Sequence, residues 1–134
     1  MSRREYRINA MKFLYLLEMG GDYDKADINP EVYKNISDLI EHTDEVENIL
    51  NKSLSGWTLN HLNLVDQAIL KYAVYEMKYL KTPYQVAINE ALEITKEYSD
   101  IDGKQVSFNN SVLDKAKELI NGWRIKIFNC HNLN

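Results

Sequence analysis

Residues 63–98 read NLVDQAILKYAVYEMKYLKTPYQVAINEALEITKEY, and this stretch decides the fold class. Its apolar side chains recur at spacings of three and four, which places each set on one face of a helix. Asn63 can cap the first helix, with Asp66 three residues later as an acidic variant of the capping box. Thr82-Pro83 breaks the pattern, because proline lacks the N–H that a continuing helix needs. The stretch predicts two amphipathic helices, with Val65, Ile69, Tyr72, Ala73 and Leu80 buried in the first and Ala87, Ala91, Ile94 and Tyr98 in the second.

Helical patterns flank this stretch on both sides. Residues 3–19 carry apolar side chains at helical spacing, and Gly20-Gly21 ends that helix. Asn29-Pro30-Glu31 is a strong helix start, and Thr43-Asp44-Glu45 offers a second one, so residues 30–54 form either one bent helix or two. A last helix is expected over residues 108–120, ending at Asn121-Gly122.

Together these patterns predict an all-α fold of about six or seven helices. Five glycines and two prolines in 134 residues are few, whereas strand-rich folds need frequent turns. The length fits one domain, which we place at residues 1–122. Residues 123–134 are expected to form a C-terminal tail, whose structure the pattern leaves open.

The composition indicates a globular protein of a reducing compartment. Hydrophobic residues make up 45% of the chain and charged residues 27%, which are ordinary values for a soluble domain. A single cysteine, Cys130, cannot form an intramolecular disulfide. The sequence shows neither a signal-peptide pattern nor a run of roughly 18 apolar residues. We therefore expect a cytoplasmic protein with no membrane partner.

Charge is distributed unevenly along the chain, although the net charge is only −4. Residues 1–12 carry a net charge of +3, residues 13–103 carry −10, and residues 104–134 carry +3. A chain with basic ends and an acidic middle can offer phosphates one surface and a basic protein another.

No motif in the sequence proposes a reaction, so we expect no catalytic residues, no cofactor and no enzyme activity. His42, His61 and His131 have no metal-ligand spacing with one another or with Cys130, so no metal site is expected. Neither a glycine-rich phosphate loop nor a nucleophile elbow is present.

Three arginines near the N-terminus form the one constellation that points to function. Arg3, Arg4 and Arg7 fall within a sector of about 100° on the first helix. Guanidinium groups pair with phosphate oxygens through planar, forked donors, and the helix N-terminus adds a favourable dipole. The alternative is a basic terminus that only aids solubility. Tyr98 and Phe108 are aromatic candidates for stacking on unpaired bases, although each could equally be a core residue.

Four stretches together resemble the NusB family of transcription antitermination proteins. They are SRREYR at residues 2–7 followed by Ala10 and FLY at 13–15, VDQAILKYAVYEM at 65–77, PYQVAINEALEI at 83–94, and FNNSVLDK at 108–115. They occur in the family's order and at its separations, from Ser2 to about Ile120. The third stretch is the most specific of the four.

The resemblance implies two small packed helical bundles and a role in the RNA polymerase antitermination complex. Family members bind the single-stranded boxA element of ribosomal RNA transcripts jointly with NusE, a small-subunit ribosomal protein. By position, the resemblance assigns RNA phosphates to Arg3, Arg4 and Arg7, and bases to Tyr98 and Phe108. It assigns the surface for NusE to Tyr15 and Asp66.

The resemblance also leaves two alternatives open. The family usually reads Phe-Val-Asn-Gly where this chain has Phe108-Asn109-Asn110-Ser111, and a lysine commonly stands in place of Ser107. These departures fit a structural or self-associating module with weakened RNA binding, and some family members form homodimers. Similar helical domains also precede the catalytic domain of some ribosomal RNA methyltransferases, but from the length of 134 residues we do not expect such a domain here.

Overall fold

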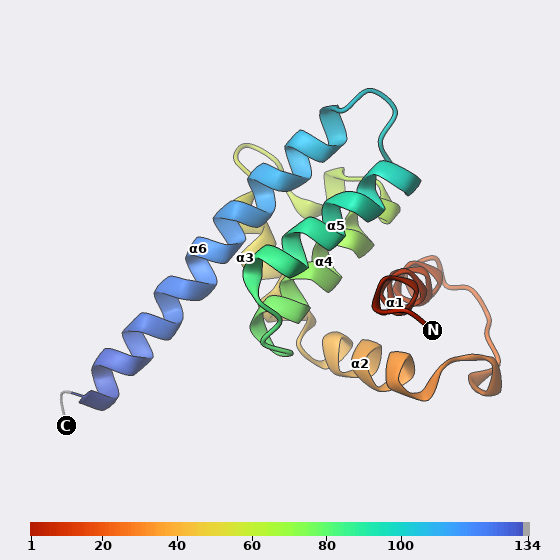
Figure 1. Ribbon diagram of the computed structural model, residues 1–134, viewed down its shortest axis with the longest axis horizontal. Coiled ribbons are helices and arrows are strands. Elements are labelled where there is room, and N and C mark those ends of the chain that lie inside the picture. Colours follow the sequence, from red (N-terminus) through yellow and green to blue (C-terminus); the bar gives the residue numbers. More distant parts are fainter. Residues whose placement is uncertain (133–134) are drawn as a thin grey trace.

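The computed structural model describes residues 1–132, and six α-helices account for most of them (Figure 1). The helices are α1 (Arg3–Glu18), α2 (Pro30–Glu41), α3 (Thr43–Ser53), α4 (Leu64–Lys78), α5 (Tyr84–Tyr98) and α6 (Lys104–Asn132). Short 3-10 helices cover Lys25–Asp27 and Leu59–His61. The described residues contain no strand, which confirms the predicted all-α class. None of the described helices is long and apolar enough to cross a membrane.

Local signals in the sequence explain where most helices begin and end. Ser2 and Glu5 form a capping box at the start of α1, and the asparagine at position 29 caps α2 ahead of its proline. After α1, Gly20 adopts a φ of 72°, a left-handed conformation that suits glycine. His42 separates α2 from α3, so the segment 30–54 is two helices rather than one bent helix.

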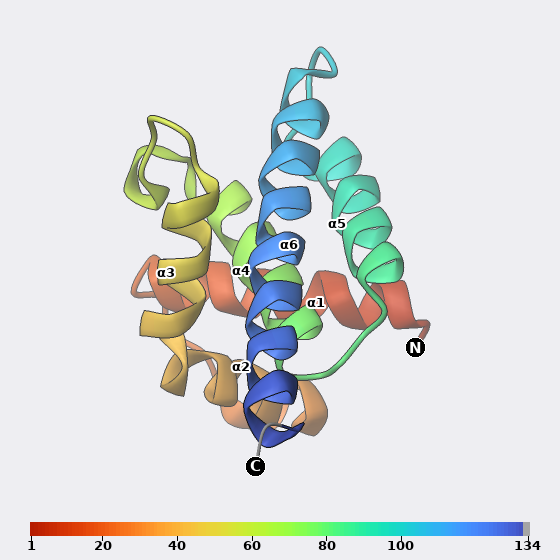
Figure 2. The same cartoon turned by 90° about the vertical axis from the view of Figure 1, so that its left-hand side faces the viewer.

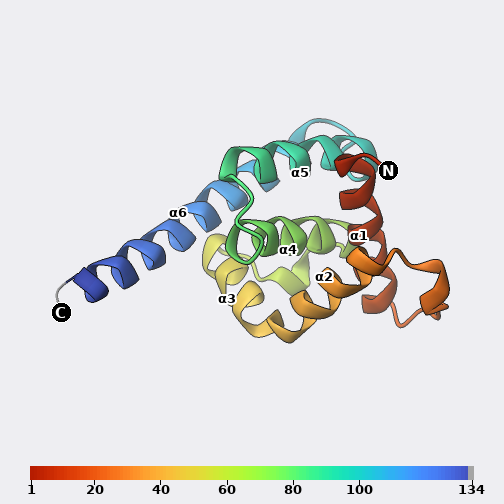
Figure 3. The same cartoon turned by 60° about the horizontal axis from the view of Figure 1, so that its bottom comes forward.

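Helix α4 forms the centre of the molecule. Figure 3 shows it between α5 on one side and α2 and α3 on the other, with α1 crossing near its end. All twelve residues from Asp66 to Met77 are buried, whereas the sequence pattern predicted burial of one face only. Leu80, predicted to be buried, is exposed because α4 ends at Lys78. The predicted burial of Tyr98 is also wrong, since 42% of this residue is exposed at the end of α5.

Helix α6 differs most from its prediction. It begins at Lys104, four residues before the predicted start, and it continues through Gly122 instead of ending there. Figures 1 and 3 show its second half projecting beyond the other helices, and in Figure 2 that half runs in front of them. Arg124 explains the continuation, because its guanidinium donates to the Tyr84 hydroxyl at 2.8 Å and to the Met77 carbonyl at 2.6 Å. The expected tail is therefore helical as far as Asn132, and its last two residues lie outside the described part of the chain.

Candidate functional site

Arg3 and Arg4 stand at the exposed start of α1. Arg4 makes a forked contact with Glu90 of α5, with Nε 2.8 Å from Oε2 and Nη2 3.2 Å from Oε1. Half of the Arg4 side chain stays exposed, and the pair holds the pKa of the Glu90 carboxyl below its ordinary value. Arg3 lies 3.7 Å from Glu31 and 4.4 Å from the centre of the Tyr6 ring, again with an exposed side chain. Both guanidinium groups can reach an anion in solvent.

Arg7 is placed differently from its two neighbours. It is buried, and its Nε lies 2.9 and 3.1 Å from the two carboxylate oxygens of Glu76 on α4. Burial raises the pKa of the Glu76 carboxyl in spite of this partner. The Arg7 guanidinium is therefore paired inside the protein, unlike those of Arg3 and Arg4, because a buried carboxylate needs a partner, and its expected contact with phosphates stays a prediction.

The two candidate stacking residues lie at the corner where α5 passes into α6. The Tyr98 ring is partly exposed, and the ammonium of Lys12 lies 5.2 Å from its centre. Phe108 is half-buried and packs against the hydrophobic core. The exposed ring of Tyr98 is thus accessible to a base, whereas part of the Phe108 side chain is packed into the hydrophobic core.

The resemblance implied that Asp66 lies on the surface, but in the structure Asp66 is buried. Only 1% of the residue is exposed, and its Oδ1 accepts hydrogen bonds from Ser99 Oγ at 2.6 Å and from Asn109 Nδ2 at 3.2 Å. The prediction of a surface carboxylate at this position is wrong, because α5 and α6 close over the start of α4. A direct contact with a protein partner would need this corner to open.

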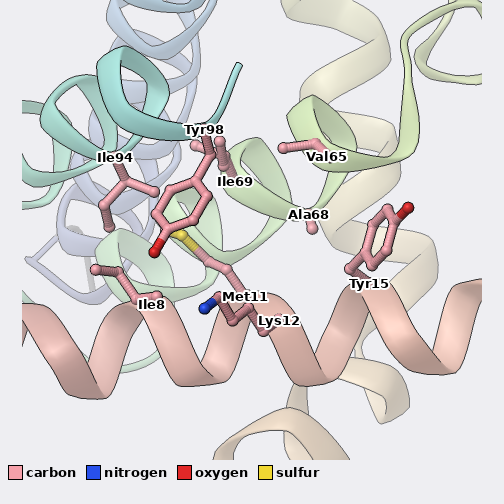
Figure 4. A pocket seen from close by; sticks show the side chains of 9 residues that line it. All are labelled: Ile8, Met11, Lys12, Tyr15, Val65, Ala68, Ile69, Ile94 and Tyr98. Atoms are coloured by element: carbon pink, nitrogen blue, oxygen red, sulfur yellow. The ribbon is translucent and has the colours of Figure 1, made fainter.

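Tyr15 and Tyr98 line a single groove of about 260 Å³ between α1, α4 and α5 (Figure 4). Figure 4 shows Tyr98 reaching from α5 toward α1, and Tyr15 standing on α1 near Ala68. The wall is apolar apart from Lys12 and the two tyrosine hydroxyls, and its remaining members are Ile8, Met11, Val65, Ala68, Ile69 and Ile94. The groove can therefore accept a flat or apolar group.

The sequence interpretation missed the groove and the place of Lys12 in it. Ile8, Lys12 and Tyr15 follow one another at spacings of four and three, which puts them on one side of α1. That signal was available, but nothing in the sequence shows that α5 lies opposite it. Among the described residues, no group of three histidine, cysteine, aspartate or glutamate side chains could hold a metal ion.

Comparison with known proteins settles the family. The model of the NusB family matches residues 4–118. The chain belongs to the NusB family. The "Transcription antitermination protein NusB" of Finegoldia magna is 40% identical over 127 residues, covering 84% of this chain and 91% of that protein. The protein of the same name from Geobacillus kaustophilus is 36% identical over 127 residues, covering 87% and 96%.

Solved structures share the fold of this NusB-family chain. NusB of T. maritima superposes with a TM-score of 0.76 at 26% identity, covering 88% of this chain and 92% of that one. A crystal structure of the antitermination factors NusB and NusE in complex with double-stranded RNA gives a TM-score of 0.71 at 23% identity, covering 87% and 96%. At that identity the second likeness shows the fold alone.

Proposed function

We propose that this chain is an antitermination factor that binds boxA-type single-stranded RNA of ribosomal RNA transcripts together with NusE, within the RNA polymerase antitermination complex. Membership of the NusB family supports the general role. The exposed pair Arg3 and Arg4, on the same helix as Lys12 beneath the open Tyr98 ring, carries the proposal for RNA. The named complex of NusB, NusE and double-stranded RNA supports the choice of partners, while the preference for an unpaired strand rests on the accessible aromatic ring.

Arg4 and Tyr98 lie along the edge where α1 meets α5, and Arg3 stands at the same end of α1 beside Glu31 of α2. Arg4 contacts Glu90, and Tyr98 follows Glu90 by eight residues on α5, which is about 12 Å along a helix. The pKa of Arg4 is raised first by its hydrogen bond to Glu90 and by the charge of Glu90, and then by the charges of Glu93 and Glu97, so these carboxylates lie close enough to repel a phosphate. We therefore place the RNA backbone along the α1 side of this edge, with a base against Tyr98 and Phe108 behind it.

Tyr15 remains our proposed contact for NusE, because it is partly exposed at the other end of the groove. Asp66 does not keep that role in the proposal, since its carboxylate is buried and bonded. Arg7 does not keep a direct RNA role either, and we assign it to the support of α1 against α4.

A fluorescence titration of labelled boxA RNA, with and without NusE, tests the proposal. We expect weak binding by the chain alone, tighter binding with NusE, and loss of affinity when the RNA is scrambled. The double variant Arg3→Ala/Arg4→Ala should lower affinity and make the slope of log affinity against log salt less steep by about 1.4, or about 0.7 for each phosphate contact.

The matched control is Lys52→Ala/Lys126→Ala, which removes two exposed positive charges beside the groove between α3 and α6. We expect it to leave the salt slope unchanged. Equal affinity for boxA and scrambled RNA in every condition would contradict the proposal and favour a structural module without specific RNA binding.

A further inference from the structure

One carboxylate oxygen of Asp66 ties together the two helix ends that carry the candidate stacking residues. Ser99 Oγ and Asn109 Nδ2 both donate to Asp66 Oδ1. Ser99 directly follows Tyr98 at the end of α5, and Asn109 directly follows Phe108 near the start of α6. Each of the two donors to this oxygen is thus the sequence neighbour of one aromatic residue.

The network around this oxygen is buried and continuous. Asn109 is fully buried, and its amide nitrogen also donates to Thr95 Oγ1 at 3.1 Å, while its amide oxygen accepts from Gln105 at 3.0 Å. Thr95 is fully buried as well and donates to the Ala91 carbonyl. Because a buried polar group is costly without its partners, these contacts hold the end of α5 and the first turns of α6 in one arrangement.

Asp66 is itself held firmly. It lies in the first turn of α4, where the helix dipole favours a negative charge, and its backbone N–H donates to the capping side chain of Asn63 at 2.8 Å. A short hydrogen bond to a charged oxygen is stronger than one between neutral groups. Asp66 therefore connects the α5–α6 corner to the central helix α4.

We propose that Asp66 is a positioning residue for RNA recognition, which fixes Tyr98 and Phe108 for base stacking through Ser99 and Asn109. This inference rests on the proposed RNA function. The resemblance assigned a direct protein contact to Asp66, whereas this inference gives Asp66 an internal role. Asn109, where the family pattern has an apolar residue, supplies one of the two links.

The test combines Asp66→Ala with removal of the aromatic rings, measured as RNA affinity in the presence of NusE. Loss of one stacked base weakens binding by roughly 5- to 150-fold. We expect Asp66→Ala to weaken boxA binding at least fivefold in the wild-type background, with an unchanged salt slope. In a Tyr98→Ala/Phe108→Ala background, the same substitution should change affinity less than twofold. An equal effect in both backgrounds would overturn the proposal.

An exchange of the two partners gives a rescue. Asp66→Asn and Asn109→Asp should each weaken RNA binding, and the combined variant should recover part of the loss because donor and acceptor have changed places. Asp38→Asn is the matched control, since this carboxylate accepts from the Tyr75 hydroxyl on the other side of α4. We expect Asp38→Asn to leave RNA affinity unchanged, and a loss as large as that of Asp66→Asn would count against a specific role.

Two further measurements separate this inference from the proposed function. Amide hydrogen exchange of the free protein should accelerate at residues 98–109 in Asp66→Ala, and unchanged exchange there would overturn the positioning role whether or not RNA binds. NusE affinity without RNA should be unaffected, and a selective loss of NusE affinity would show a direct contact instead. Failure of the wild-type chain to bind boxA would contradict the proposed function itself.

Discussion

At the scale of single residues, three arginines of one helix have two kinds of surroundings. Arg3 and Arg4 keep exposed guanidinium groups beside carboxylates at the surface, whereas Arg7 is buried against Glu76. Helical spacing placed all three on one side of α1, and that is correct for the backbone. Spacing could not show that the last of them meets a buried carboxylate from a helix 69 residues further along the chain.

Loss of the Arg7 guanidinium should destabilise the fold strongly. Arg7→Ala leaves Glu76 buried without its cation, which typically costs about 3–5 kcal/mol. Replacing both groups, as in Arg7→Met/Glu76→Leu, should recover most of this loss. Arg4→Ala, which removes an ion pair that solvent can reach, should cost much less than Arg7→Ala. Urea denaturation of the four proteins measures these differences, and equal losses for Arg7→Ala and Arg4→Ala would contradict the assigned burial.

The Arg4–Glu90 pair should make stability depend on acid. Arg4 lowers the pKa of Glu90 in the folded state, whereas the unfolded chain has an ordinary value of about 4.3. The stabilisation is therefore present above that value and is lost as the pH falls through the folded-state pKa. Unfolding free energies between pH 6 and pH 3 should fall more steeply for wild type than for Glu90→Gln. Parallel curves would show that the pair does not persist in solution.

At the scale of helices, the starts were predictable and the ends were less so. Caps such as Asn29 and Asn63 use nearby residues, so they are visible in sequence, and both hold in the structure. The end of α6 was not predictable, because Gly122 is a common stop signal but here takes no left-handed conformation. The contacts of Arg124 with α4 and Tyr84 carry the helix past it, and those contacts depend on tertiary structure.

Gly122→Ala should therefore stabilise the protein. A Cβ added at this glycine meets nothing within 4 Å, and alanine in a helix interior is favoured over glycine by about 0.5–1 kcal/mol. Gly103→Ala is the opposite case, since Gly103 has a φ of 85° that strains any other residue. Thermal unfolding should show a raised Tm for the first variant and a lowered Tm for the second. A lowered Tm for Gly122→Ala would indicate that α6 ends near this residue in solution.

At the scale of the whole molecule, the fold class and the family followed from sequence, whereas the surface did not. The all-α class and the NusB resemblance are confirmed. Assignments to Tyr15, Tyr98 and Phe108 stay predictions, and Asp66 shows why position alone is not enough. Aspartate has a short side chain, and at the start of α4 it bonds inward to Ser99 and Asn109. Only the packing of α5 and α6 reveals that choice.

Tyr15→Ala should separate the two partners. Tyr15 lines the groove without contributing to the Arg3–Arg4 edge, so we expect a loss of NusE affinity and nearly unchanged affinity of the chain alone for boxA. Tyr98→Ala should do the reverse. Isothermal titration of each variant with NusE and with boxA RNA checks this. If both variants lose affinity for both partners, the two residues do not bind separate partners.

The groove between Tyr15 and Tyr98 has a further consequence for the order of assembly. If a protein binds one rim of the groove and a nucleotide binds the other, the two binding equilibria belong to one thermodynamic cycle. Any factor by which the protein raises the affinity for the nucleotide is then also the factor by which the nucleotide raises the affinity for the protein. Nascent transcript would then recruit the ribosomal protein as effectively as the protein recruits transcript. Neither arrival needs to come first, and the cooperativity would originate in a few side chains of α1, α4 and α5.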